Sequence, residues 1–244
     1  MAGHNKWSKI KHRKAVVDKR RGKAWSMCSR AIISAVRQGG PDPAFNFALR
    51  AALDEAKYHN VPADNIERAI RKGAGGAAGD NFELARYEGY GPGGVAVIVD
   101  ALTDNRTRTA ANVRNIFDDF GGKLGVAGCV AHMFAHKGRF EVSAPAREED
   151  RVIELALAAG ADDVRSVDEG TFEVLCAPER VGAVHAGLKA AGLTLSPPAT
   201  EMIPHTLTRV EGEHAEGVSA MLEELEDDED VKKVFSNGEI EEAE

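Results

Sequence analysis

Apolar residues recur every three or four positions through residues 25–72, which is the spacing of helices buried on one side. Glycine and proline divide this stretch into three segments. The pattern therefore predicts three short amphipathic helices that bury one another's apolar stripes as a small bundle. The first starts by Trp25 and ends at Gly39-Gly40, the second starts at Asp42-Pro43 with the aspartate as its N-cap, and the third runs from near Pro62 to Gly73.

The rest of the chain alternates short apolar runs with helical patterns, which predicts an α+β arrangement. The run Val95–Leu102 is apolar at almost every position, as in a strand that is buried on both faces. The other helices are expected at Asn105–Phe120, Glu148–Ala159, Glu179–Ala191 and residues 218–225. The other strands are expected at Cys129–Phe134, Arg139–Val142, Val164–Val167, Thr171–Cys176, Thr200–Leu207 and Val231–Phe235.

The order of these elements predicts the domain plan. The outer elements follow a split β-α-β, β-α-β pattern, the ferredoxin-like arrangement, and the elements between them form a second α+β unit. We therefore expect the fold class α+β, with an N-terminal three-helix basic domain followed by two ferredoxin-like α+β domains, one inserted into the other. The expected boundaries are 1–23 for a basic flexible arm, 24–80 for the helical domain, 81–135 and 198–244 for the two halves of the outer domain, and 136–197 for the inserted domain.

The charge changes sign along the chain. The formal net charge is −8, yet residues 1–72 hold sixteen Lys and Arg against six Asp and Glu. The excess is densest in residues 1–23, which carry nine cations and one acid. Apolar residues are sparse in this arm, so we expect it to be mobile when free. An arm of this kind is typical of proteins that bind a polyanion and release its counterions.

We predict that nucleic acid, either DNA or ribosomal or messenger RNA, binds this arm and the basic helical domain. An indole among the cations is suited to stack on an unpaired base; the alternative is a solvated basic tail with Trp7 docked on the bundle. No motif for reading a base sequence is evident, so phosphate contacts are expected to dominate. The candidate residues of the arm are Lys6, Trp7, Lys9, Lys11, His12, Arg13, Lys14, Lys19, Arg20, Arg21 and Lys23.

Two further cations, Arg106 and Arg108, lie beside the start of the helix expected at residues 105–120. A cation there opposes the helix dipole, at a cost of roughly 0.3–1 kcal/mol, so something should offset it. One interpretation is pairing with Asp100 or Asp104. The other is that Arg106, Arg108 and Arg114 hold a phosphate of the nucleic acid.

An acidic run, Glu223–Asp230, follows the solvent face of the helix expected at residues 218–225. One interpretation is that these charges keep the protein soluble and prevent self-association. The alternative is that they repel nucleic acid, which would confine its contact to the basic end of the chain, or bind a basic protein such as a ribosomal one.

The residues that most often carry chemistry form no recognisable site pattern. Cys28, Cys129 and Cys176 are far apart and form no CxxC pair, which indicates small buried side chains in a reducing cytoplasm. His132 and His136 are four residues apart on an expected strand, without the glutamate of a helical zinc motif. We therefore expect no metal, no cofactor and no enzymatic activity. We also expect a cytoplasmic monomer without a membrane span or secretory signal.

Four stretches of the chain resemble the YebC/PmpR family, in the same order. They read GHNKWSKIKHRKA at residues 3–15, NIERAIRKGAGG at 65–76, YEGYGPGGVAVIVDALTDNRTRT at 87–109 and GGKLGVAGCVAHMF at 121–134. The resemblance covers nearly the whole chain and is densest before residue 140. Asn5 and Cys129 depart from the family pattern, since serine is usual at both positions, and neither change alters the charge.

The resemblance implies a helical N-terminal domain and two α+β domains, one inserted in the other. Bacterial members are described as DNA-binding transcriptional regulators, and the mitochondrial relative as a translational activator of cytochrome c oxidase. Bacterial relatives have also been linked to ribosomes that translate proline-rich stretches.

Our first hypothesis is therefore a non-enzymatic, DNA-binding transcriptional regulatory protein of the YebC/PmpR type. The alternative is a translation factor that binds RNA or the ribosome through the same arm. A third hypothesis is an adaptor whose acidic α+β domains bind a protein partner.

Overall fold

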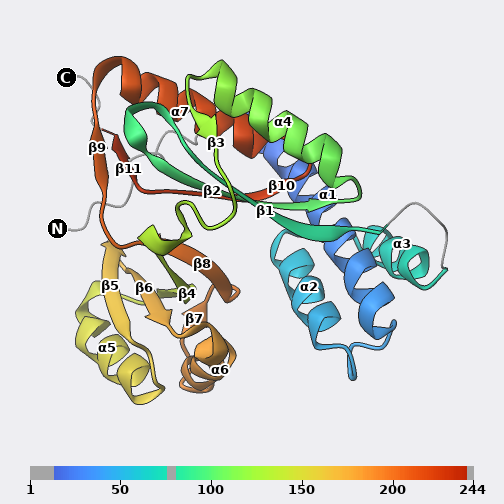
Figure 1. Ribbon diagram of the computed structural model, residues 1–244. Helices are drawn as coiled ribbons and strands as arrows, with labels where there is room; N and C mark the ends of the chain where they lie inside the picture. The colour runs from blue at the N-terminus through green and yellow to red at the C-terminus, as the bar shows by residue number, and fades with distance from the viewer. Residues whose placement is uncertain (1–13, 76–80, 241–244) are drawn as a thin grey trace. The chain divides into compact units, whose positions relative to one another are not determined.

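The computed structural model describes the backbone of residues 14–75 and 81–240, with side chains from Arg21 onward. A helical N-terminal region is followed by antiparallel sheets with helices between their strands, which confirms the predicted α+β class (Figure 1). The chain divides into two compact units. The first comprises the residues up to Met133 together with those from Thr206 onward, and the second is Phe134–His205.

Three helices form the N-terminal part of the first unit: α1 (Lys14–Gly39), α2 (Phe47–Tyr58) and α3 (Ala63–Ala74). Most residues of the apolar stripes expected from the sequence face one another in a shared core. Phe45, expected in the stripe of the second helix, is instead exposed, because it lies in the turn before α2. A Cβ atom on Gly73 would lie 2.7 Å from Cβ of Val36, so only glycine lets α3 approach α1 this closely. The fully buried members of the core are Cys28, Ile32, Ile33, Ala35, Val36, Leu49, Ala52, Ala56, Val61 and Ala69.

The prediction that the second helix starts at Asp42-Pro43 is wrong. These residues form a turn in which the Asp42 carboxylate accepts a hydrogen bond from the amide of Ala44 at 2.8 Å. Helix α2 begins at Phe47, and its N-cap is Asn46, whose side-chain oxygen accepts from the amide of Leu49 at 2.9 Å. Asn46 takes the place of Asp42 as the cap because its side chain also reaches the preceding helix.

Asn46 is almost fully buried between α1 and α2. Its side-chain nitrogen donates to the carbonyl of Ala35 at 2.7 Å and to the carbonyl of Gly40 at 2.8 Å. A Cβ on Gly39 would lie 2.7 Å from the Asn46 amide, so the end of α1 can meet this side chain only as glycine. A single amide therefore caps α2 and satisfies carbonyls at the end of α1.

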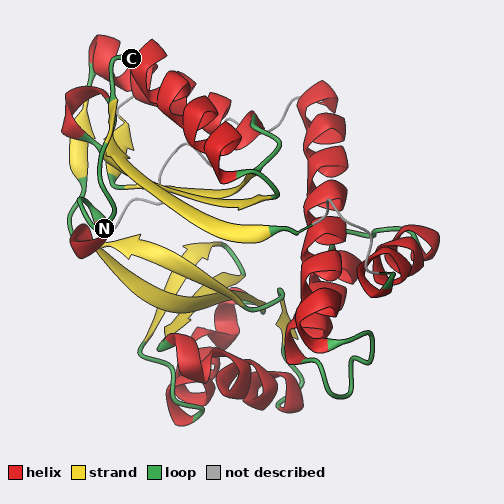
Figure 2. Cartoon of the chain, turned by 45° about the vertical axis from the view of Figure 1, so that its right-hand side comes forward, coloured by secondary structure: helices red, strands yellow, loops and turns green. Residues whose placement is uncertain are grey.

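The rest of the first unit is built on a four-stranded antiparallel sheet with the order β10-β2-β1-β3. Its helices α4 (Arg106–Asp119) and α7 (Gly212–Asp227) cover one face of the sheet (Figure 2). The strands are β1 (Glu83–Tyr90), β2 (Ala96–Thr103), β3 (Lys123–Leu124) and β10 (Val231–Ser236), and a 3₁₀ turn, η2 (Pro92–Gly94), joins β1 to β2. Two short strands, β9 (Thr208–Val210) and β11 (Gly238–Ile240), pair in parallel beside it.

This sheet has the spatial order of a ferredoxin-like fold but reaches it by a different path along the chain. Strands β2 and β3 flank β1 and are joined through α4, which is a split β-α-β unit. In the usual ferredoxin-like arrangement, the strand that lies between β2 and β3 in the sheet would come after β3 in the chain. Here that strand is β1, which comes before β2 in the chain. The sequence analysis missed β1 because a buried glutamate, Glu88, interrupts its apolar alternation.

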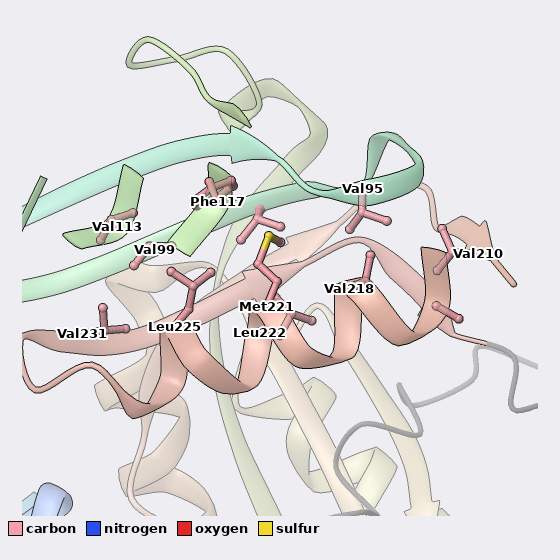
Figure 3. Packing of buried hydrophobic residues seen from close by; sticks show 12 residues of the cluster. Val95, Val99, Val113, Phe117, Val210, Val218, Met221, Leu222, Leu225 and Val231 are labelled. Atoms are coloured by element: carbon pink, nitrogen blue, oxygen red, sulfur yellow. The ribbon is translucent and has the colours of Figure 1, made fainter. Parts of the chain in front are cut away.

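The core of this sheet lies under α7. Val218, Met221, Leu222 and Leu225, predicted to face inward, are each at most 3% exposed. They pack against the valines of β2 and against Phe117 of α4 (Figure 3). The predictions of a central strand at residues 95–102, a helix at 105–120 and a strand at 231–235 are confirmed.

The strand predicted at Cys129–Phe134 is wrong over most of its length. This segment is a turn followed by a 3₁₀ helix, η3 (Ala131–Met133). The carboxylate of Glu88 accepts hydrogen bonds from the backbone amides of Gly128, Val130 and Ala131 at 2.9–3.0 Å. Those amides cannot pair with a strand because the buried carboxylate of Glu88 binds them. Burial alone would raise the pKa of Glu88, but these three hydrogen bonds prevail and lower it.

The second unit is a complete ferredoxin-like domain with the strand order β5-β6-β4-β7. Two helices, α5 (Glu149–Ala158) and α6 (Val181–Ala190), cover one face of its sheet, and each is preceded by a 3₁₀ turn, η4 (Ala146–Glu148) or η5 (Pro178–Arg180). The strands are β4 (Phe134–Ser143), β5 (Asp163–Asp168), β6 (Thr171–Cys176), β7 (Thr194–Leu195) and β8 (Ala199–Pro204). Strand β8 extends the β7 edge along β4 and ends before the predicted limit at Leu207.

Replacing Asn46 by alanine tests its role between α1 and α2. Loss of an N-cap and two buried carbonyl contacts should lower the free energy of unfolding by about 1–3 kcal/mol. Chemical denaturation measures this, with Asn115→Ala on the exposed face of α4 as the control, which should change it by less than about 0.5 kcal/mol. Equal effects of the two substitutions would contradict the assignment.

Candidate nucleic-acid interface

The basic arm predicted through residue 23 overlaps with α1, which begins at Lys14, so residues 14–23 are helical. Helix α1 continues into the predicted arm from the part that packs against α2 and α3. Lys14, Lys19 and Arg20 lie on this helix, and Arg21 is exposed on it. The remaining candidates, Lys6, Trp7, Lys9, Lys11, His12 and Arg13, lie outside the described residues.

Lys23 lies against the C-terminal end of α7. Its ammonium group donates a hydrogen bond to the backbone carbonyl of Glu226. Burial lowers the pKa of Lys23, although Asp228 and Asp227 act in the opposite direction. A helix C-terminus carries partial negative charge, which stabilises a cation there. Lys23 therefore links α1 to the end of α7.

A buried carboxylate, Asp230, joins α1 to the sheet and to α4. Its Oδ1 lies 2.7 Å from Nη1 of Arg30 on α1, and its Oδ2 lies 2.7 Å from Nη2 of Arg108 on α4. The hydroxyls of Thr109 and Thr103 donate to the same Oδ2 at 2.8 and 3.3 Å. Arg30 also donates to the backbone carbonyls of Leu102 and Glu229.

The two arginines of the α4 start occupy different environments. Arg108 bridges Asp230 and Asp104, whose carboxylate lies 2.8 Å from its Nη2, so the predicted pairing with Asp104 is present. These hydrogen bonds raise the pKa of Arg108. Arg106 is exposed, and its closest carboxylate contact is 3.7 Å from Glu83. Since Arg108 is committed to two carboxylates, Arg106 is the better candidate of the two for a phosphate.

The acidic run Glu223–Asp230 engages cations of its own chain. Asp230 and the backbone of Glu229 bind Arg30, and the carbonyl of Glu226 binds Lys23. Neither interpretation of the sequence anticipated this intramolecular use. The run therefore neutralises part of the α1 surface.

A groove of about 320 Å³ runs between α1 and α3. Arg68 and Lys72, one turn apart on α3, contribute two cations to its rim, and both are exposed. The indole nitrogen of Trp25 donates to the carbonyl of His59 at 2.9 Å, which fixes the ring in the groove wall. The remaining lining residues are Ser26, Ser29, Ile33, Asn65 and Ala69.

This groove combines groups that can donate to phosphate oxygens: two cations, the hydroxyl of Ser26 and the amide of Asn65. The hydroxyl of Ser29 already donates to the carbonyl of Trp25 at 2.9 Å. The sequence analysis assigned binding to the basic helical domain but named no residue of α3. The signal was present in the stretch Asn65–Gly76, where Arg68 and Lys72 stand four residues apart and so share one face of a helix.

Other candidate sites have simpler outcomes. No three His, Cys, Asp or Glu side chains gather as a metal site in the part of the chain that the structure describes. Cys28 and Cys176 are buried, and burial raises the pKa of both thiols, to about 11 for Cys28. Within the same residues, none of the helices is both long enough and apolar enough to cross a membrane.

The architecture is a helical basic domain joined to two sheet domains, one of which is inserted in the other. Residues 5–76 match the model described as the TACO1/YebC protein N-terminal domain, and residues 82–238 match the model of the TACO1/YebC second and third domain. The chain belongs to the TACO1/YebC family, which confirms the resemblance drawn from the sequence.

Similar proteins cover the chain from end to end. A probable transcriptional regulatory protein of Bordetella petrii is 51% identical over 243 residues, covering 100% of both chains. One from Desulforamulus reducens is 47% identical, covering 99% of this chain and 100% of its own. The crystal structure of a conserved hypothetical protein from Aquifex aeolicus is 44% identical, with a TM-score of 0.84 over 97% of this chain and 98% of that one.

Replacing Asp230 by asparagine tests the buried carboxylate. Burial opposes its ionisation, but hydrogen bonds from Arg108, Thr109 and Arg30 prevail and lower the pKa of Asp230. Because its folded pKa lies below the unfolded value of about 4, this stabilisation is present above pH 4 and is lost as the pH falls through the folded pKa. The substitution should lower the free energy of unfolding at pH 7 by about 3 kcal/mol, since it leaves Arg30 and Arg108 uncompensated.

Denaturation at several pH values measures both effects. The difference between wild type and Asp230→Asn should shrink below pH 4, when the native carboxyl becomes protonated. Asp54→Asn, which removes an exposed partner of Lys57, is the control and should change the stability by less than about 0.5 kcal/mol. A pH-independent difference would show that the charge of Asp230 is not what stabilises this junction.

Proposed function

We propose that this protein regulates gene expression by binding nucleic acid, without catalysing a reaction, through its basic N-terminal residues and the helices α1 to α3. The observation that carries the proposal is the segregation of charge. Residues 1–72 hold sixteen cations and six acids, whereas the whole chain is −8. Within the first unit the backbone carbonyl of Glu226 binds Lys23 and the carboxylate of Asp230 binds Arg30. Arg68 and Lys72 are exposed beside the α1–α3 groove.

DNA is the first candidate partner, with the protein acting as a transcriptional regulator. The names of the relatives in Bordetella petrii and Desulforamulus reducens support regulation of transcription. The charge pattern supports phosphate contacts, which position a protein on a duplex without selecting a sequence. Specificity would then come from the shape of the target or from a protein partner.

RNA is the second candidate, with the protein acting as a translation factor on the ribosome. Two exposed aromatic rings on the helical domain, Phe45 and Phe47, favour RNA. Unpaired bases that could stack on these rings are common in RNA, whereas the bases of a DNA duplex are paired and stacked on one another. Crosslinking in cells followed by sequencing separates the two: promoter DNA would support the first candidate and ribosomal RNA the second. Recovery of neither would favour an adaptor that binds proteins through its acidic domains.

Deleting residues 2–13 tests the arm while leaving α1 intact. Five to eight phosphate contacts should give the full protein a log–log salt slope of about −4 to −7. The deletion removes Lys6, Lys9, Lys11 and Arg13, so the slope should become shallower by about three to four and the affinity at low salt should fall. Fluorescence anisotropy with labelled duplex DNA and single-stranded RNA at several salt concentrations measures both.

Deleting residues 241–244 is the control at the other terminus, because it removes acids and leaves every cation in place. Its affinity should equal or slightly exceed that of the full protein. If the deletion of residues 2–13 leaves both affinity and salt slope unchanged, the arm takes no part in binding.

Replacing Arg68 and Lys72 by alanine together tests the α1–α3 groove. Loss of two phosphate contacts should make the salt slope shallower by about 1.4–1.8 and weaken binding uniformly across nucleic-acid sequences. The matched control is Arg147→Ala with Lys189→Ala, which removes two exposed cations from the inserted unit. The groove is excluded if the two double variants bind alike in the same anisotropy titration.

A further inference from the structure

The helical domain exposes two phenylalanine rings on either side of a buried residue. Phe45 is 89% exposed and Phe47 is 76% exposed, whereas Asn46 between them is 5% exposed. Aromatic side chains of this size normally dominate cores and interfaces. Two neighbouring rings that are left in solvent therefore need an explanation beyond the folding of the domain.

The structure holds these rings in place although they are exposed. Asn46 binds the carbonyls of Ala35 and Gly40 and the amide of Leu49, which ties the segment to α1 and starts α2. The Asp42 carboxylate accepts from the amide of Ala44, which fixes the preceding turn. A partner would therefore meet a preorganised pair of rings and would not have to order a loop on binding.

A cation accompanies the rings. The guanidinium carbon of Arg50 lies 5.3 Å from the centroid of the Phe47 ring, in the geometry of a cation–π contact. Arg50 is exposed, and no carboxylate pairs with it among the described residues. Its donors are therefore directed to solvent or to a ligand that approaches the ring.

Beyond the two rings, the exposed face of α2 carries only the small apolar side chains of Ala48 and Ala51 before Tyr58, and charged residues interrupt this apolar surface. The next exposed side chains on that helix include Arg50, Asp54 and Lys57, and the last two form an ion pair at 3.3 Å. A protein partner that buries an apolar face would need a larger continuous patch. A nucleotide needs a flat ring for its base and a cation for its phosphate, and residues 14–75 carry twelve Lys and Arg against six Asp and Glu.

We propose that Phe45 and Phe47 stack with unpaired bases of a single-stranded nucleic acid, while Arg50 contacts the adjacent phosphate. This inference rests on the proposed function, nucleic-acid binding by the helical domain, and adds a preference for single strands. Bases in a duplex are stacked on one another, so only an unpaired or splayed segment can place its bases on these rings. The phosphate contacts made elsewhere in the domain would be shared by single and double strands.

The double substitution Phe45→Ala with Phe47→Ala tests the stacking site in the full chain. Affinity for a 20-nucleotide oligo(U) RNA should fall roughly 10-fold to 100-fold, because each stacked base contributes substantially to binding. Affinity for a duplex of the same length should change less than about twofold, and the salt slope should stay the same, since no cation is removed. Restoring aromaticity with Phe45→Tyr and Phe47→Tyr should recover most of the single-strand affinity, whereas leucine at both positions should not.

Two controls separate stacking from damage to α2. Tyr58→Ala removes another exposed aromatic ring, at the opposite end of the same helix, and should leave oligo(U) binding unchanged. Wild-type protein should bind a single-stranded DNA that contains abasic sites roughly 10-fold to 100-fold more weakly than an intact single-stranded DNA of the same length. This second comparison needs no variant of α2 and holds even if the substitutions lower the melting temperature.

Each outcome has a distinct meaning. Wild-type protein that binds no nucleic acid at low salt overturns the proposed function and this inference together. Salt-dependent binding that is equally strong in wild type and in the double alanine variant overturns only the stacking site. A wild-type dimer that the double substitution converts to a monomer, as measured by sedimentation equilibrium, would also overturn it, because the rings would then serve a second copy of this chain.

Discussion

The junction at Asp230 determines how the helical region and the sheet of the first unit form one body. One buried carboxylate receives guanidinium groups from α1 and α4, and hydroxyls from α4 and from the end of β2. Removing such a charge from water is costly, and only its full complement of donors makes the burial tolerable. The position of α1 therefore depends on this network of ion pairs and hydrogen bonds, in which the loss of one group leaves the others without a partner.

This network also sorts the cations of the first unit by role. Arg30, Lys23 and Arg108 are held by carboxylates or carbonyls of the same unit. Arg68 and Lys72 border the α1–α3 groove on a different helix and remain exposed. An excess of positive charge in a sequence thus overstates the number of cations that a partner can reach.

Local patterns in the sequence were sufficient for most of the elements. The apolar stripe of α7 and the continuous run of β2 depend on periodicity alone, and both were predicted at the right places. The errors in predicting helix and strand positions occurred where the hydrogen bonds of one polar side chain, and not a local sequence pattern, determine the structure. Asn46 displaced Asp42 as the cap of α2, and Glu88 both concealed β1 and removed the amides of residues 128–131 from a sheet.

The sequence predicted that the candidate site is positively charged, but not which of its residues pair with one another and which are exposed. The pairing of Arg108 with Asp104 followed from their spacing of four, whereas its contact with Asp230 joins residues 122 positions apart. No periodic pattern encodes such a pair. The exposure of Phe45 and Phe47 was equally hidden, because both lie inside the helix predicted from Asp42-Pro43, where Phe45 was expected to join the buried stripe.

The location of Asp230 near the end of the chain has a consequence for synthesis. The inserted unit, Phe134–His205, is contiguous and can fold as soon as it leaves the ribosome. The first unit cannot, because α7, β10 and the carboxylate that binds Arg30 are translated last. During that interval Arg30 and Lys23 lack the acidic partners that later hold them. The nascent N-terminal region is therefore more cationic on its accessible surface than the finished protein, and polyanions in its surroundings would compete with the native junction until translation ends.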